Sequence, residues 1–72
     1  MKKVTDRVRV TPSVELSDMR LSGLAGRCGV VTELVMAVPC QVIGYMVLLD
    51  KSFQGEHLWF VPQDAIEDET AH

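Results

Sequence analysis

The fold class is clearest in residues 41–67, QVIGYMVLLDKSFQGEHLWFVPQDAIE. Residues 41–49 are rich in apolar and β-branched side chains, which suits a strand, and the polar residues that follow close it. Residues 54–56, Gln-Gly-Glu, form a turn signal at hairpin spacing. Residues 57–61 are again apolar and aromatic. The pattern therefore predicts two antiparallel strands joined by a turn.

The end of this stretch predicts one 3₁₀ turn and a short final strand. Proline's fixed φ suits the first position of such a turn, which Pro62 opens over residues 62–65. The last strand is expected around Ile66. Residues 68–72 are expected to form a flexible acidic tail. A single domain is thus predicted over residues 1–67.

Two further strands lie upstream of this stretch. Residues 7–10, RVRV, alternate polar and apolar side chains with the period of a half-buried strand. A second strand is expected to open at Gly26 and Gly29 and to continue through the β-branched residues 30–32. Pro39 marks the turn that follows it. Residues 13–23 are predicted to be a long loop or to hold one short helical turn capped at Ser17.

These five short strands, without an amphipathic helix, predict an all-β domain. A flat open sheet would leave its edges exposed, so a small closed barrel is expected. The chain has 72 residues, which allows a single core and no second lobe. Hydrophobic residues make up 47% and charged residues 24% of the chain, which argues for a compact globule rather than a disordered segment.

Residues 59–67, WFVPQDAIE, resemble the end of an SH3-like barrel, in which a strand closes on a proline before a 3₁₀ turn and a last short strand. Residues 7–10 and the segment LAGRCGVV at 24–31 are similar to the opening of the compact SH3-like families, which include KOW-type modules and an electron-transport accessory group. Ala65 stands where peptide-binding SH3 domains have a tyrosine, so binding of proline-rich peptides is not expected. The resemblance implies a five-stranded barrel that docks onto larger proteins and has no chemistry of its own.

Charge is distributed unevenly along the chain. The net charge is −3, with +3 over residues 1–27 and −6 over residues 28–72. An acidic domain without a dense basic run is not expected to bind nucleic acid, because phosphate neutralisation by Lys and Arg supplies most non-specific affinity. The alternative hypothesis is a KOW-like nucleic-acid-binding module that uses the basic residues of the N-terminal part. These are Lys2, Lys3, Arg7, Arg9, Arg20 and Arg27.

The reactive side chains predict no enzyme, no cofactor and no metal site. Cys28 and Cys40 are not at zinc-ligand spacing and are expected to be buried, reduced thiols without a disulfide. His57 is the one histidine before the tail, and its neighbour Glu56 points to the opposite face of a strand. The second alternative is therefore a small accessory subunit whose larger partner supplies the catalytic residues.

The chain also lacks the sequence features of a membrane or secreted protein. The longest uncharged run, residues 34–49, is shorter than the ~18 apolar residues that a spanning helix needs. Residues 1–10 contain no apolar signal region. A soluble cytoplasmic protein without membrane contact is expected.

The most informative segment is the hairpin over residues 28–49. Sixteen of its twenty-two residues are hydrophobic and Glu33 is its single charge, whereas strict alternation in a small barrel would leave every second residue polar. Both faces of the hairpin are therefore apolar. The side chains expected to fill the interior are Val30, Leu34, Val42 and Leu48.

Three explanations of this apolar surplus remain open. The loop over residues 13–24 covers the hairpin with Val14, Leu16, Met19 and Leu21, or the chain self-associates there, or the hairpin docks on a larger protein partner. The last two explanations make protein interaction the predicted function. The predicted contact residues are Val35, Met36, Val38, Tyr45 and Phe60.

Overall fold

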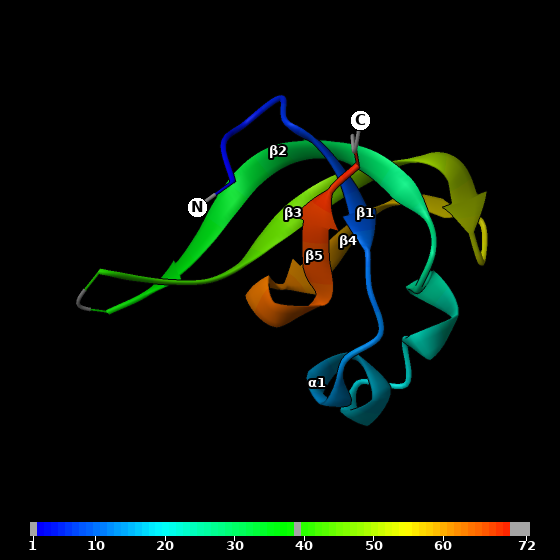
Figure 1. Ribbon diagram of the computed structural model, residues 1–72, viewed down its shortest axis with the longest axis horizontal. Coiled ribbons are helices and arrows are strands. Elements are labelled where there is room, and N and C mark those ends of the chain that lie inside the picture. The colour runs from blue at the N-terminus through cyan, green and yellow to red at the C-terminus, as the bar shows by residue number, and fades with distance from the viewer. Residues whose placement is uncertain (1, 39, 70–72) are drawn as a thin grey trace.

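The computed structural model describes residues 2–38 and 40–69, which form one antiparallel five-stranded sheet with little helix (Figure 1). The strand order across the sheet is β4-β3-β2-β1-β5. The all-β prediction is confirmed. In chain order the elements are β1 (Arg7–Val10), α1 (Val14–Asp18), the 3₁₀ turn η1 (Ser22–Leu24), β2 (Cys28–Ala37), β3 (Gln41–Phe53), β4 (Glu56–Pro62), the 3₁₀ turn η2 (Gln63–Ala65) and β5 (Ile66–Asp68).

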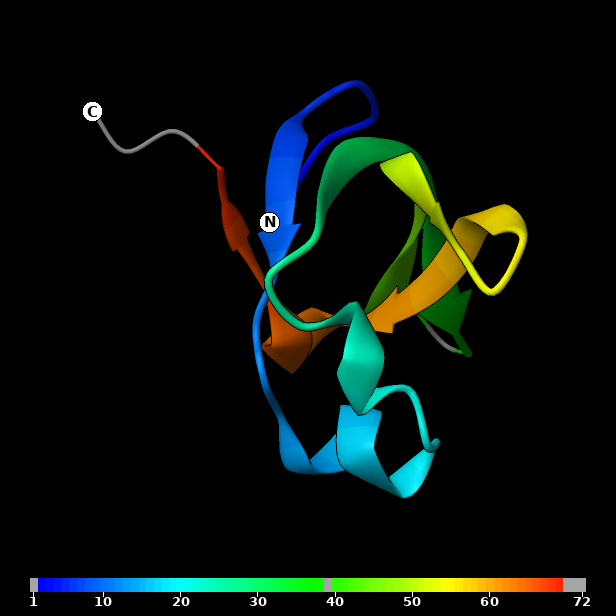
Figure 2. The same ribbon diagram turned by 90° about the vertical axis from the view of Figure 1, so that its right-hand side faces the viewer.

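The sheet curls around its core but does not close into a hydrogen-bonded barrel. Figure 2 shows the strands bending around a common interior. β4 and β5 occupy the two edges of the sheet, with η2 joining them, and over the described residues no ladder connects one edge to the other. The predicted closed barrel is therefore replaced by an open, strongly curved sheet.

The concave side of this sheet holds the hydrophobic core. β1 contributes Val8 and Val10, which confirms the inward direction predicted for both residues from the RVRV alternation. β3 contributes three consecutive inward positions, 45, 47 and 49. The fully buried set comprises Val8, Val10, Leu16, Leu24, Val31, Tyr45, Val47, Leu49, Val61 and Ala65.

A β-bulge in β2 changes which side chains of this strand face inward. Val31 pairs with Val47 and Glu33 pairs with Met46, so Thr32 is an extra residue in β2. The Thr32 hydroxyl donates a hydrogen bond to the Met46 carbonyl oxygen at 3.3 Å. An extra residue shifts the alternation of a strand by one position. Strand positions 30 and 34, which share a face in a regular strand, consequently lie on opposite faces.

A second bulge has the same effect on β3. Val35 pairs with Gly44 and Met36 pairs with Val42, which leaves Ile43 as the extra residue. Val42 packs against the core, as predicted. Leu48, however, is on the opposite side and is 47% exposed, so its predicted inward position is wrong.

The same correction applies to Val30 in β2. Leu34 packs against the core as predicted. Val30 pairs directly with Leu48, and directly opposed residues share one face of a sheet. Val30 therefore lies on the convex side and not in the predicted interior.

The segment between β1 and β2 folds over one end of the sheet. Ser13 caps α1, because its Oγ accepts a hydrogen bond from the Leu16 backbone N–H at 3.0 Å. The helix cap is therefore Ser13, four residues before the predicted cap at Ser17. Leu16 and Leu24 enter the core, and α1 contacts β4 and η2. In Figure 1 this segment lies far from the free end of the β2–β3 hairpin.

The C-terminal strand joins the two ends of the chain. β5 pairs with β1 through Val10 opposite Ile66 and Val8 opposite Asp68. The Glu69 backbone N–H donates to the Arg7 carbonyl oxygen at 3.2 Å. The backbone contacts with β1 therefore continue to Glu69. The remainder of the predicted acidic tail, residues 70–72, lies outside the described residues.

Candidate docking surface

The convex side of β2, β3 and β4 carries apolar side chains in register on all three strands. Leu48 of β3 lies between Val30 of β2 and Leu58 of β4, and is paired with both. The next outward row pairs Met46 of β3 with Phe60 of β4. Because directly opposed residues lie side by side on one face, these rows form a continuous apolar area. We call it the outer face; it consists of Val30, Met46, Leu48, Leu58 and Phe60.

The centre of the outer face is open to solvent. Leu48 and Leu58 are 47% and 48% exposed. The Phe60 ring packs down over Gly44, where an added Cβ would lie 2.5 Å from the ring atoms Cε1 and Cζ. Phe60 thus covers the one β3 position that has no side chain, and it extends the apolar area along the strand. The two leucines form a half-exposed pair with no described element above them.

The predicted contact residues do not lie on one surface. Phe60 belongs to the outer face, and Val35, which pairs with Gly44, lies beside it. Met36 is 51% exposed and Val38 is 95% exposed at the free end of the β2–β3 hairpin, and Met36 pairs with Val42 on the concave side. These two residues form a separate surface that we call the hairpin tip.

Tyr45 is not available for contact with a partner. It is only 3% exposed and belongs to the core. Its hydroxyl oxygen accepts a hydrogen bond from the Lys2 backbone N–H at 3.1 Å, which secures the N-terminal segment to β3. The prediction of Tyr45 as a contact residue is therefore corrected. The even spacing of positions 46, 48, 58 and 60 is the sequence signal that identifies the actual face, once Tyr45 is recognised as inward.

Acidic side chains lie around the outer face. Glu33 is exposed and pairs with Met46, and Glu56 is exposed at the start of β4, two residues before Leu58. Neither carboxylate forms an ion pair with another residue that the structure describes. Two acids without an ion pair among the described residues therefore lie at opposite sides of the apolar rows.

A third acid, Asp50, is neutralised. Both Arg7 terminal nitrogens donate to its carboxylate, at 2.8 and 2.6 Å, and Arg7 Nε donates to Glu69 at 2.8 Å. The hydrogen bonds from Arg7 lower the pKa of Asp50 below its ordinary value. The two carboxylates in turn raise the pKa of Arg7. This network ties β1 to β3 and to the residue after β5.

Two further basic side chains of the N-terminal part, Lys2 and Arg9, are also paired with C-terminal acids. Lys2 Nζ lies 2.9 Å from an Asp68 carboxylate oxygen, and an Arg9 terminal nitrogen lies 3.4 Å from a Glu67 oxygen. The pairing between β1 and β5 brings these opposite charges together. Three of the six basic residues of the N-terminal part are therefore in ion pairs among the described residues.

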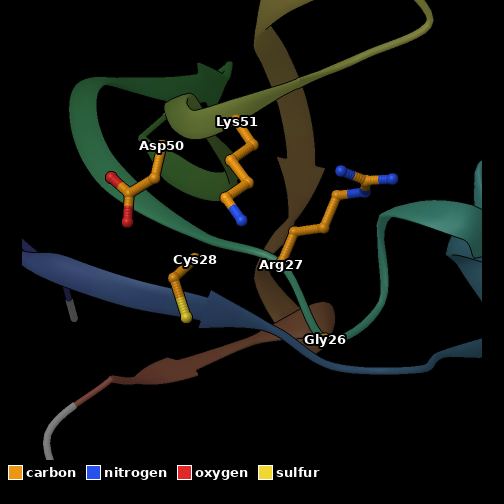
Figure 3. A pocket seen from close by; sticks show the side chains of 5 residues that line it. All are labelled: Gly26, Arg27, Cys28, Asp50 and Lys51. Atoms are coloured by element: carbon orange, nitrogen blue, oxygen red, sulfur yellow. The ribbon is translucent and has the colours of Figure 1, made fainter.

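A cleft of about 270 Å³ lies between the start of β2 and residues 50–51 of β3 (Figure 3). It is lined by Gly26, Arg27, Cys28, Asp50 and Lys51. Its charged groups do not converge. The Arg27 side chain extends away from Cys28 (Figure 3), donates to the carbonyl oxygens of Gly23 and Ser52, and lies over the Phe53 ring at 4.8 Å. The Asp50 carboxylate is bound by Arg7.

The reactive groups do not form a catalytic arrangement within the part of the chain that the structure describes. His57 Nδ1 is 3.0 Å from the Leu49 carbonyl oxygen, so this ring is held against the backbone. Both cysteines are free, Cys28 half-buried in β2 and Cys40 exposed in the hairpin turn. The prediction of a buried Cys40 is wrong, because the turn places this residue beyond the core. Residues 2–38 and 40–69 contain no cluster of three or more potential metal ligands.

Comparison with known proteins identifies no relative. The chain matches no protein-family model, no curated protein and no solved structure. Among the described residues, none of the helices has the length and apolar character needed to cross a bilayer.

Proposed function

We propose that this chain is a non-catalytic docking domain that binds a protein partner through the outer face. The observation that carries the proposal is the half-exposed pair Leu48 and Leu58, flanked by three further apolar side chains in register. Single exposed apolar residues are normal on protein surfaces, but contiguous apolar areas are typical of interaction sites. Met46 adds a side chain that adapts to different partners.

The way the chain uses its other apolar residues supports this proposal. A domain of this size has a small core, so it is expected to bury the leucines that are available to it. The β1–β2 segment brings Leu16 and Leu24 into the core, yet its helix lies against β4 and η2 and leaves Leu48 and Leu58 exposed. This segment thus covers one end of the sheet and not the outer face. The first of the three explanations therefore does not account for the exposed leucines.

The accessory-subunit role is a specific form of this proposal. The strand order β4-β3-β2-β1-β5 and the 3₁₀ turn before the last strand support the expected SH3-like architecture. The resemblance of residues 59–67 to such barrels implies docking on a larger protein without chemistry of its own. The separated positions of His57, Cys28 and Cys40 fit that role.

The nucleic-acid-binding alternative receives less support. Phosphate recognition needs cations that are free to exchange their counterions. Lys2, Arg7 and Arg9 are each engaged with carboxylates at the C-terminal end of the domain. Arg27 is bound to backbone oxygens and to an aromatic ring. Four of the six predicted basic side chains therefore have contacts within the domain, and those of Lys3 and Arg20 are the two without an ion pair or hydrogen bond among the described residues.

Purification of the tagged chain from its native host tests the docking proposal. We expect a partner to be recovered in fixed stoichiometry with the wild-type chain and with Val14→Ser, which changes an exposed apolar residue on α1. The Leu48→Ser/Leu58→Ser variant is expected to lose that partner while it unfolds at the same temperature as the wild-type chain. Equal recovery with the face variant, or loss with Val14→Ser as well, would contradict the proposal.

A further inference from the structure

We propose that the outer face binds a segment that presents apolar side chains flanked by lysine or arginine, and that a second copy of this chain is not its occupant. This inference rests on the proposed docking function and adds the chemistry of the partner. Two features carry it: the apolar rows, and two acids beside them that form no ion pair among the described residues.

The apolar rows define where the partner's own apolar side chains pack. Val30, Leu48 and Leu58 run across three strands, and Met46 and Phe60 form the adjoining row. The rows expose side chains without a deep cleft, so a helix or strand with one apolar side fits them.

The acids define the charge of the partner's flanks. Glu33 lies beside Met46 at the β2 end of one row, and Glu56 lies beyond Leu58 on β4. Each is exposed, and neither is paired with a cation within residues 2–38 and 40–69. A partner cation placed at either position gains an ion pair without breaking one.

The cations on the neighbouring strands do not pair with Glu33 or Glu56 among the described residues. Arg7, which is opposite Val30 on β1, is held by Asp50 and Glu69. Lys51 lines the cleft beside Cys28 and Asp50 (Figure 3) and forms no ion pair with either glutamate. Both glutamates are therefore open to a cation of the partner.

This charge pattern disfavours a second copy as the occupant. Two outer faces placed against each other would bring Glu33 and Glu56 of both chains to one interface, and each chain carries a net charge of −3. Like charges opposed at an interface suppress association, whereas complementary charge favours it. A partner with apolar side chains flanked by cations fits both the apolar rows and the two glutamates.

Titration with two synthetic amphipathic peptides tests this inference. Both carry leucines on one side of a helix; one has lysines on the other side and its control has glutamates. We expect the lysine peptide to shift the amide NMR signals of Met46, Leu48 and Leu58, and the glutamate peptide to bind at least about tenfold more weakly.

Paired variants separate local complementarity from the overall negative charge. Glu33→Gln/Glu56→Gln is expected to weaken binding of the lysine peptide by about three- to tenfold, the range of two exposed ion pairs. Asp18→Asn/Asp64→Asn removes the same charge away from the outer face and is expected to leave the affinity unchanged. Equal weakening by both pairs would overturn the inference, because the attraction would then be non-specific.

The remaining outcomes are also decisive. If both peptides bind the outer face equally, the partner chemistry is wrong while the docking function stands. If neither binds and the chain forms dimers that Leu48→Ser/Leu58→Ser abolishes, the occupant is a second copy and the inference fails. If neither peptide binds and the chain remains a monomer, the inference fails too, and the purification experiment decides the docking function separately.

Discussion

Gly29 occupies a position in β2 that has no room for a side chain. A Cβ at this residue would meet the Leu48 carbonyl oxygen and would lie 2.9 Å from the Leu49 Cα. Both obstructing atoms belong to the backbone of β3, so they cannot move aside without disturbing the β2–β3 ladder. The sequence marked this glycine as the opening of a strand, but the close approach is visible only in the structure.

We expect Gly29→Ala to lower the free energy of unfolding by about 1–3 kcal/mol, as overpacking does. Gly23→Ala is the matched control, because its Cβ would meet the Phe53 ring, a side chain that can shift. Urea denaturation of the two variants checks the prediction. An equal loss of stability in both would show that backbone obstruction at Gly29 is not the cause.

A second residue-scale prediction concerns two carboxylates that are close together. The Asp64 carboxylate on η2 raises the pKa of Glu15 on α1, first through charge repulsion and then through a hydrogen bond between the two side chains. A folded-state pKa above the unfolded value means that the fold gains stability as pH falls through that pKa and loses it as pH rises. Glu15→Gln is therefore expected to stabilise the protein at neutral pH.

The pH dependence distinguishes this effect from a general gain in helix propensity. At about pH 3, below the ordinary glutamate pKa of ~4.3, Glu15 is protonated and the advantage of Glu15→Gln should vanish. Asp50→Asn is the opposite case, because Arg7 lowers the pKa of Asp50 and the stability from that pair is lost as pH falls through the lowered value. Chemical denaturation across this pH range is the measurement. A stabilising effect of Glu15→Gln that persists in acid would contradict the repulsion.

At the scale of elements, α1 depends on a single capping side chain to bring Leu16 into the core. The helix has only five residues, Val14–Asp18, and the Ser13 Oγ accepts the Leu16 backbone N–H. Leu16 is 1% exposed. The hydrogen bond of the cap thus helps to hold Leu16 in the core at one end of the sheet.

We expect Ser13→Ala to cost about 1 kcal/mol of stability, the usual value for loss of an N-cap. Ser17→Ala, at an exposed position of the same helix that does not cap it, is expected to be neutral or slightly stabilising because alanine favours helices. Thermal unfolding of both variants checks this. If Ser17→Ala were the more damaging change, the cap assignment would be wrong.

The bulges explain which elements the sequence could and could not predict. The strands and the 3₁₀ turn after Pro62 follow from turn signals and apolar periodicity, although β3 continues through the polar residues 50–52 to Phe53, four residues past its predicted end. The faces of β2 and β3 were not predicted, because an extra residue at Thr32 and another at Ile43 each shift the alternation. Nothing local in a sequence distinguishes a bulge from a regular strand residue. Because the bulges decide which residues face outward, the candidate surface contains Leu48 and Leu58 and does not contain the predicted Tyr45.

For the whole molecule, the pairing of β1 with β5 joins the two ends of the domain. It brings Lys2 to Asp68 and Arg9 to Glu67. Such contacts between residues far apart in the sequence cannot be predicted from local sequence patterns. The sequence did show an excess of basic residues at one end and of acidic residues at the other. That Lys2, Arg7 and Arg9 pair with the C-terminal acids is a result of the sheet topology.

We expect a chain that ends at residue 65 to lose its cooperative unfolding transition, whereas a chain that ends at residue 69 retains it. The shorter chain lacks β5 and the acids Glu67, Asp68 and Glu69, which pair with Arg9, Lys2 and Arg7. A domain of this size has a net stability of roughly 4–10 kcal/mol, so the loss of an entire strand removes a large share of it. Circular dichroism during heating compares the two chains; equal transitions would contradict the structural role of β5.

The central claim is that the apolar residues of the outer face serve a partner and not the fold. Urea denaturation of Leu48→Ser/Leu58→Ser tests this claim most directly, because it needs no knowledge of the partner. We predict a free energy of unfolding within about 1 kcal/mol of the wild-type value, the loss of one exposed cross-strand pair. A loss of about 4 kcal/mol or more, as two buried leucines would give, would show that these residues belong to the core and would contradict the claim.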